Sequence, residues 1–158
     1  MESPALDNQS NIPIAQPLAS YSTARAVPIT SGVQLLYISG TTARQPDGRI
    51  PPFDTNCDGS LSAAFIQTGI ILEKIESTIR QFSSGTYGLE ALVDLTIFVL
   101  NLDRDYVEVN KAYNQVIAEA FHDKGCPLPA RTCVQVSAMP PDERSLVEIK
   151  GLARLGQI

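Results

Sequence analysis

The spacing of apolar residues predicts two amphipathic helices. In the first, over residues 61–82, the apolar positions are Leu61, Ala64, Phe65, Leu72, Ile75, Ile79 and Phe82. The positions expected on its solvent side are Glu73, Lys74, Glu76 and Arg80. Asp58 or Ser60 is a candidate N-terminal cap, and Gly85 is expected to end the helix.

The second predicted helix begins at about Arg104. Its apolar stripe consists of Tyr106, Val109, Tyr113, Val116, Ile117 and Phe121. His122, Lys124 and Gly125 suit the last turn and the stop, because cations and glycine are favoured at helix C-termini. We therefore interpret His122 as a helix-end residue.

Five shorter segments have the composition of β-strands: residues 21–27, 33–38, 92–100, 131–138 and 145–154. Segment 33–38 is apolar on both faces, and segment 92–100 is rich in β-branched and aromatic residues, so both are predicted to be buried strands. Residues 39–41 are expected to end the strand over residues 33–38. The elements alternate without a βαβ repeat: two strands, a Pro-rich irregular stretch, then helix, strand, helix and two strands. This order predicts an α+β fold.

We expect the last two strands to form an antiparallel hairpin around Pro140-Pro141. If the loop has an even number of residues, one face of the hairpin is apolar and carries Val134, Val136, Ala138, Val147 and Ile149. The other face carries Arg131, Cys133, Gln135, Ser137, Leu146, Glu148, Lys150 and Leu152. This second face is too apolar for a solvated surface. We expect a second subunit to cover it, which would place Arg131 and Glu148 in a cleft between chains.

An Arg and a Glu in a sheltered cleft suit one kind of chemistry. Arg131 can clamp a carboxylate with two parallel hydrogen bonds. Glu148 can hold and deprotonate a water molecule. Together they suit hydrolysis of a small carboxylate-bearing substrate. The alternative is a cross-strand Arg–Glu or Lys–Glu ion pair with no chemical role.

Composition excludes several classes of partner and site. Twelve Lys and Arg against seventeen Asp and Glu give a formal charge of −5, and no basic run occurs, which argues against nucleic acid or an anionic membrane as partner. The longest apolar stretches are far shorter than the ~20 residues of a membrane-spanning helix. One His and three Cys (Cys57, Cys126 and Cys133), without a C-x-x-C pair, predict no metal site.

The size of the chain, 158 residues, suits one domain. Residues 1–18 are rich in Pro, Asn and Gln and lack the features of a secretory signal, so we expect a flexible arm followed by a single domain over residues 19–158. The odd number of cysteines favours a reducing compartment, and we expect the cytosol.

Five short motifs, in order, resemble the RidA-type reactive imine/enamine deaminases. They are Tyr21, residues 37–40 (YISG), 109–113 (VNKAY), 129–134 (PARTCV) and 147–149 (VEI) with Ala153 closing. The resemblance covers about Tyr21 to Ala153. It implies a chorismate-mutase-like α+β fold with two helices on one face of a mixed sheet, and a homotrimer with three clefts between subunits. It also implies a hydrolase acting on C–N bonds that converts an imine or enamine to a carbonyl and ammonia.

The resemblance also implies roles for particular residues. Arg131 would bind the substrate carboxylate and Glu148 would position the water. Ser39 and Gly40 would shape the floor of the pocket, while Asn110 and Tyr21 would border it. Cys133 would lie beside Glu148. No metal or organic cofactor is expected, because the iminium carbon is already electrophilic.

Residues 39–47 (SGTTARQPD) are more similar to the 2-aminomuconate deaminases within this family. This likeness implies an enamine dicarboxylate as substrate, with Arg44 meeting the second carboxylate. The alternatives are a general 2-iminoacid deaminase of the aminoacrylate type, an enzyme of secondary metabolism acting on another enamine, and a non-catalytic trimeric module that binds small carboxylates or a protein. A binding module would tolerate Gln in place of Glu148, whereas a hydrolase would not.

Several of these residues also have purely structural interpretations. Asn110 is equally well explained as a partner of local backbone groups, as Asn often is. Tyr21 is as well explained by packing at a subunit interface. Cys133 is either a reactive thiol or, more simply, a small inert filler. Arg44 lies beside a predicted turn, where exposed Arg is common.

Overall fold

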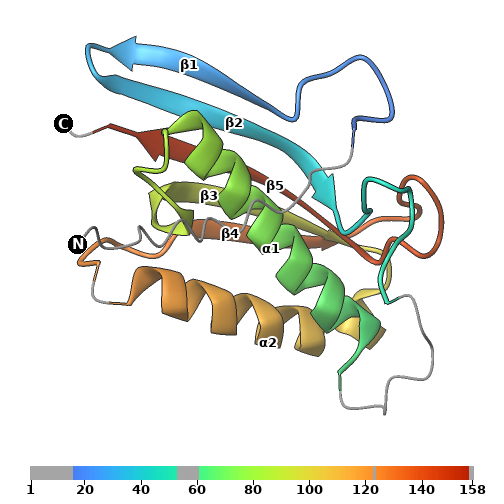
Figure 1. Cartoon of the computed structure of the whole chain (residues 1–158). Coiled ribbons are helices and arrows are strands. Elements are labelled where there is room, and N and C mark those ends of the chain that lie inside the picture. Colours follow the sequence, from blue (N-terminus) through green and yellow to red (C-terminus); the bar gives the residue numbers. More distant parts are fainter. Residues whose placement is uncertain (1–15, 53–60, 123, 157–158) are drawn as a thin grey trace, which may run out of the picture.

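The computed structural model describes residues 16–52, 61–122 and 124–156, in which a five-stranded sheet carries two long helices on one face (Figure 1). The strands are β1 (Ala24–Thr30), β2 (Val33–Thr42), β3 (Leu92–Val99), β4 (Ala130–Gln135) and β5 (Val147–Leu155). The helices are α1 (Ala63–Phe82) and α2 (Leu102–Phe121), with a short 3-10 turn η1 (Leu89–Ala91) before β3. The predicted α+β class and the positions of both helices are confirmed.

The order of the strands across the sheet is β1-β2-β5-β3-β4, and it contradicts the predicted final hairpin. β4 pairs with β3 in parallel, and β5 lies between β2 and β3, antiparallel to both. The reason is the connection through α2, which returns the chain to the end of the sheet where β3 began. A strand that follows such a helical crossover pairs in parallel with the strand before it.

The pairing of β3 with both β4 and β5 decides which side chains share a face. Ile97 is the partner of Cys133 on one side and of Ile149 on the other, and this face packs against the helices. Phe98 is the partner of Val134 and of Glu148, which therefore lie on the opposite face. The prediction that Arg131, Cys133 and Glu148 share one face was wrong, because β3 intervenes and changes the register by one residue.

The ends of the helices are set by side-chain caps. The hydroxyl of Ser62 accepts a hydrogen bond from the Phe65 amide at 3.1 Å, and Asn101 accepts one from the Arg104 amide at 3.0 Å. Ser62 therefore caps α1, while the predicted candidates at positions 58 and 60 lie outside the described residues. Gly85 stops α1 as predicted: it has φ of 82° and donates its amide to the Arg80 carbonyl at 2.8 Å.

The core lies between the helices and one face of the sheet. Its fully buried members include Leu36, Ile71, Leu72, Ile75, Ile79, Leu95, Ile97, Val99, Val147 and Ile149. The opposite face, which we call the open face, has no helix packed on it in Figure 1. Val27, Tyr37 and Val134 are exposed large apolar side chains of this face, and Tyr37 is 51% exposed.

β2 contains a bulge that extends it beyond the predicted end. Ile38 pairs with Gly151 and Thr41 with Ile149, so Ser39 and Gly40 together stand opposite one residue of β5. The prediction that residues 39–41 end this strand was wrong. Because β1 starts at Ala24, opposite Ile38, the last residues of β2 run past the start of β1.

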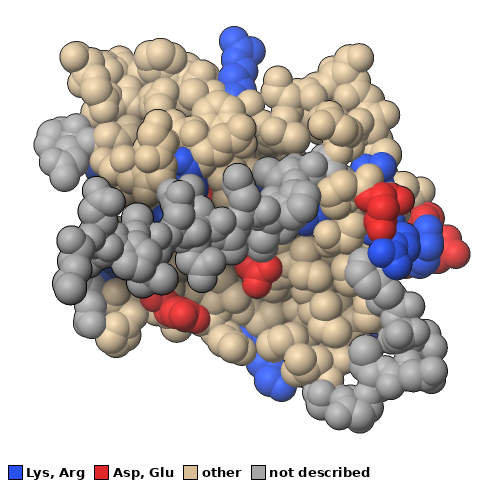
Figure 2. Space-filling model, in the orientation of Figure 1, with Lys and Arg blue, Asp and Glu red and all other residues tan. Residues whose placement is uncertain are grey.

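No helix in the described part of the chain is long and apolar enough to cross a membrane. On the face of the molecule seen in Figure 2, the visible Lys and Arg side chains are scattered or lie beside acidic ones, with no continuous basic patch.

Candidate active site

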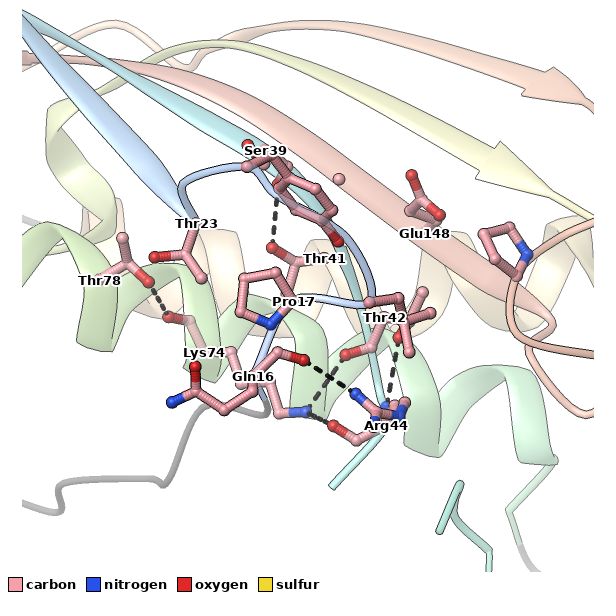
Figure 3. A pocket seen from close by; sticks show the side chains of 14 residues that line it. Gln16, Pro17, Thr23, Ser39, Thr41, Thr42, Arg44, Lys74, Thr78 and Glu148 are labelled. Atoms are coloured by element: carbon pink, nitrogen blue, oxygen red, sulfur yellow. Dashed lines mark hydrogen bonds between the residues drawn. The ribbon is translucent and has the colours of Figure 1, made fainter. Parts of the chain in front are cut away.

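A pocket of about 350 Å³ lies where the end of β2 runs past β1 (Figure 3). Its lining residues are Gln16, Pro17, Leu18, Tyr21, Thr23, Ser39, Gly40, Thr41, Thr42, Arg44, Lys74, Thr78, Pro140 and Glu148. The pocket thus reaches from the open face, where Glu148 lies, to helix α1. Five of the predicted site residues line it: Tyr21, Ser39, Gly40, Arg44 and Glu148.

Glu148 is the acidic residue of this pocket. It stands opposite Thr42 of β2, and its carboxylate lies against the α-carbon of Gly40, where any β-carbon would overlap it. The side chain of Glu148 makes no hydrogen bond or ion pair to the residues that the structure describes. Burial raises the pKa of the Glu148 carboxyl above its usual range, which makes the ionised form a stronger proton acceptor.

The segment before β1 forms one wall of the pocket and is held by three hydrogen bonds. The Ser39 hydroxyl donates to the Ser22 carbonyl at 2.7 Å, and the Ser39 amide donates to the Thr23 carbonyl at 2.9 Å. The Arg44 guanidinium donates to the Gln16 carbonyl at 3.0 Å. Residues 16–18 of the predicted arm therefore belong to the pocket wall, while residues 1–15 lie outside the described part.

Lys74 corrects the predicted solvent face of α1. Its side chain is only 2% exposed, and its ammonium donates to the carbonyls of Thr42 at 3.2 Å and Arg44 at 2.5 Å. Burial, followed by repulsion from Arg44, lowers the pKa of Lys74 to about 8. A signal was present in the sequence: position 74 lies three residues after Ile71 and four before Thr78, both of which are buried.

A second group of predicted residues gathers on the helix side of the sheet, at edge strand β4. The Arg131 guanidinium donates to the side-chain oxygen of Asn110 at 2.6 Å and lies 4.8 Å from the centre of the Tyr113 ring. Asn110 therefore orients Arg131. The alternative, in which the Asn110 side chain binds local backbone groups, was wrong. Tyr113 was predicted only as a core residue.

Cys133 lies near Arg131 on the same face and packs against the core rather than beside Glu148. Burial raises the pKa of the Cys133 thiol, an effect that the charge of Arg131 opposes in part. A thiol with a raised pKa stays protonated at neutral pH, which favours the filler interpretation over a reactive one.

The eight predicted residues thus lie in two separate groups in one chain. Glu148, Gly40, Ser39, Tyr21 and Arg44 line the pocket at β2 and β5, whereas Arg131, Asn110 and Cys133 lie at β4 and α2. Neither Arg131 nor Glu148 has an ion-pair partner within the described residues, so the alternative of a structural Arg–Glu or Lys–Glu pair in one chain was wrong. Residues 16–52, 61–122 and 124–156 contain no group of three or more His, Cys, Asp or Glu that could hold a metal ion.

Comparison with known proteins places this arrangement in a family. The chain is 36% identical over 140 residues to a protein named 3-aminoacrylate deaminase RutC from Acinetobacter baylyi, with 88% of this chain and 90% of that protein covered. It is 32% identical over 87 residues to a RutC family protein, UK114, from Drosophila melanogaster, with 55% of this chain and 54% of that protein covered.

Solved structures agree on the fold. TdcF from E. coli, solved with bound serine, has a TM-score of 0.66 at 20% identity over 92% of this chain and 94% of its own. YyfA of the Rid protein family from Yersinia pestis has a TM-score of 0.62 at 29% identity over 94% of this chain and 96% of its own. A family model described as Endoribonuclease L-PSP matches residues 13–155. The chain therefore belongs to the Ribonuc_L-PSP family, which is the family of the RidA-type proteins that its motifs resemble.

Proposed function

We propose that the protein is a hydrolytic deaminase that converts a small carboxylate-bearing enamine or imine to the oxo acid and ammonia. The observation that carries this proposal is the carboxylate of Glu148, which is half-buried in a pocket, has a raised pKa and has no partner among the described residues. Such a group is available to bind a water molecule and accept its proton. The relative named 3-aminoacrylate deaminase supports the same class of reaction.

In the proposed reaction, the substrate reacts as its imine tautomer. Water bound to Glu148 attacks the imine carbon, the carboxylate takes the proton from the water, and the C–N double-bond electrons move to nitrogen. Glu148 then returns a proton to nitrogen. The product of this addition is a carbinolamine. Glu148 then transfers the hydroxyl proton of the carbinolamine to the amino nitrogen, the C–N bond breaks, ammonia leaves, and the carbon–oxygen double bond of the oxo acid forms. The imine carbon is electrophilic by itself, so the sequence of steps uses only the substrate, water and one carboxyl group.

Arg131 would hold the substrate carboxylate in this reaction. It lies on the opposite face of the sheet from Glu148 in the same chain, so we infer that the two come from different subunits of an oligomer. Two features support this: the open face exposes apolar side chains, and β4 is an edge strand. A homotrimer with three shared sites, as in the family, would give a mass in light scattering near three times 17.1 kDa.

For the substrate, 2-aminomuconate is the candidate that the pocket favours over 3-aminoacrylate. 3-Aminoacrylate has one carboxylate, whereas the pocket contains two cations besides the Arg131 that a neighbouring subunit would supply. About 350 Å³ lies in the range of sites for small organic ligands, so a six-carbon dicarboxylate is an appropriate size.

Release of ammonia from enamines generated in solution tests the proposal. Wild-type protein should accelerate the release, and Glu148→Gln should lower turnover by about 10²–10⁴-fold with little change in binding, because Gln can hold water but cannot accept its proton. Glu119→Gln, which changes an exposed carboxylate of α2, is the matched control and should leave turnover unchanged. Full turnover by Glu148→Gln would contradict the mechanism and favour a binding module.

A further inference from the structure

Two cations lie together in the pocket without a counterion among the residues that the structure describes. Lys74 and Arg44 both line it, and Lys74 donates its ammonium to the backbone carbonyl of Arg44. In Figure 3 the Arg44 guanidinium donates to the Gln16 carbonyl and the Lys74 ammonium to the carbonyls of Thr42 and Arg44, and both cations lie on the other side of the pocket from Glu148. Neither cation has an ion-pair partner within the described residues.

Lys74 is the more unusual of the two because its side chain is 2% exposed. Its aliphatic stem belongs to the buried side of α1, between Ile71 and Thr78. An ammonium group has three N–H donors, and the carbonyls of Thr42 and Arg44 account for two of them. One donor is therefore left for a group that enters the pocket.

Buried charges in proteins are normally paired, because an uncompensated charge in a poorly solvated site costs free energy. Here two positive charges repel each other, and the repulsion from Arg44 contributes to the lowered pKa of Lys74. An anion in the pocket would remove both penalties. A carboxylate suits the pair, since it can accept from a guanidinium and an ammonium at the same time.

We propose that Lys74, together with Arg44, binds a second carboxylate of the substrate, so that the protein selects small dicarboxylates over monocarboxylates. This inference rests on the proposed function for the identity of the reacting group. Lys74 acts as a specificity-determining residue: it binds the end of the substrate away from the carbon that water attacks. The pocket then has Glu148 on one side and the cation pair of Lys74 and Arg44 on the other.

Two stable six-carbon dienes that differ in one carboxylate test the proposal directly. Muconate (hexa-2,4-dienedioate) and sorbate (hexa-2,4-dienoate) should be titrated into the assembled protein by calorimetry. We expect the wild type to bind muconate at least about tenfold more tightly than sorbate. Lys74→Met retains the length of the side chain without the charge, and should weaken muconate binding by about tenfold or more while leaving sorbate binding within about threefold.

Two further variants complete the test. Arg44→Met keeps the backbone carbonyl that accepts from Lys74, so it should fold even if Lys74→Met does not. Because it lacks the guanidinium, it should lose the selectivity for muconate over sorbate. Lys111→Met removes an exposed lysine from α2 and should bind both ligands as the wild type does. Equal weakening of muconate and sorbate by both Lys74→Met and Arg44→Met would overturn the proposal and leave Lys74 a tether for the end of β2. Equal affinity of the wild type for both ligands would overturn it as well.

The same variants separate this inference from the proposed function. Ammonia release from 3-aminoacrylate, which has only one carboxylate, reports on the deaminase alone, and the control Lys111→Met should match the wild type in it. Muconate selectivity that depends on Lys74 in a protein that deaminates no enamine would support the subsite and contradict the deaminase. Wild-type deamination of 3-aminoacrylate without muconate selectivity would support the deaminase and contradict the subsite.

Discussion

The carboxylate of Glu148 occupies the space that a side chain would need at Gly40. A β-carbon at Gly40 would lie 2.8 Å from the carboxyl carbon of Glu148 and would overlap its Oε1 oxygen. The bulge in β2 brings the backbone of Gly40 to this position, opposite β5. Glycine is therefore required here for close approach, and the half-buried position of the Glu148 carboxylate depends on it.

Gly40→Ala should displace the Glu148 carboxylate without unfolding the protein, because Gly40 is exposed and its backbone has no positive φ. We expect kcat for ammonia release to fall by about 10–100-fold, since small misplacements of a reacting group are costly. Gly69→Ala on α1 is the control, because a β-carbon at Gly69 meets nothing within 4 Å. A Gly40→Ala variant with wild-type kcat would show that turnover does not depend on the position of the Glu148 carboxylate.

Asn110→Ala should act on substrate binding through Arg131. The hydrogen bond of 2.6 Å fixes the guanidinium, and bonds to charged groups contribute about 1.5–3 kcal/mol. We expect KM to rise by about tenfold with a smaller change in kcat, as for a residue that positions the binding group. Asn114→Ala, an exposed position one turn further along α2, should retain the wild-type KM. An unchanged KM for Asn110→Ala would mean that Arg131 is held in place by other contacts.

The sequence predicted the helices and strands well and their arrangement less well, for a physical reason. Helical periodicity is local, so α1 and α2 begin within two residues of the expected positions. The pairing of strands is not local. β4 and β5 have similar alternating patterns, and these patterns do not indicate which strand each of them pairs with. The wrong hairpin followed from their closeness in the sequence, and the true register moved Glu148 to the open face.

Lys74 illustrates a second limit of the sequence. A charged residue between Glu73 and Ile75 was assigned to solvent on its charge alone. A long aliphatic stem can be buried if the ammonium reaches hydrogen-bond acceptors, and those acceptors are carbonyls some thirty residues away in the chain. Only the folded structure brings the end of β2 and α1 together. Gly40, in contrast, was predicted as a site residue from the family motifs alone, whereas Arg131 and Glu148 were first predicted from one face of the expected hairpin.

Glu148→Gln should make the protein more stable at neutral pH while it removes activity. Burial raises the pKa of the Glu148 carboxyl in the folded state, so folding favours its protonated form. The contribution of this group to stability is present below the unfolded-state pKa and is lost as the pH rises through the folded-state value. At pH 7 the ionised carboxylate is therefore destabilising, and Gln avoids this cost.

Thermal unfolding at several pH values measures this effect. The Tm of Glu148→Gln should exceed that of the wild type at pH 7, and the difference should shrink as the pH falls toward 4, because a growing fraction of the wild-type carboxyl is then protonated in both states. Turnover by the wild type should fall as the pH decreases through the raised pKa of Glu148. A Tm for Glu148→Gln at or below the wild-type value at pH 7 would be inconsistent with a desolvated carboxylate.

The central claim is that each active site combines Glu148 of one subunit with Arg131 of another. Co-expression of Arg131→Ala and Glu148→Gln chains with different affinity tags gives mixed oligomers that can be purified by both tags in turn. In a mixed trimer, one of the three shared sites contains a native Arg131 and a native Glu148. We predict that mixed trimers of two inactive parents recover about one third of wild-type ammonia release per trimer. Mixed trimers that are as inactive as both parents would contradict the claim.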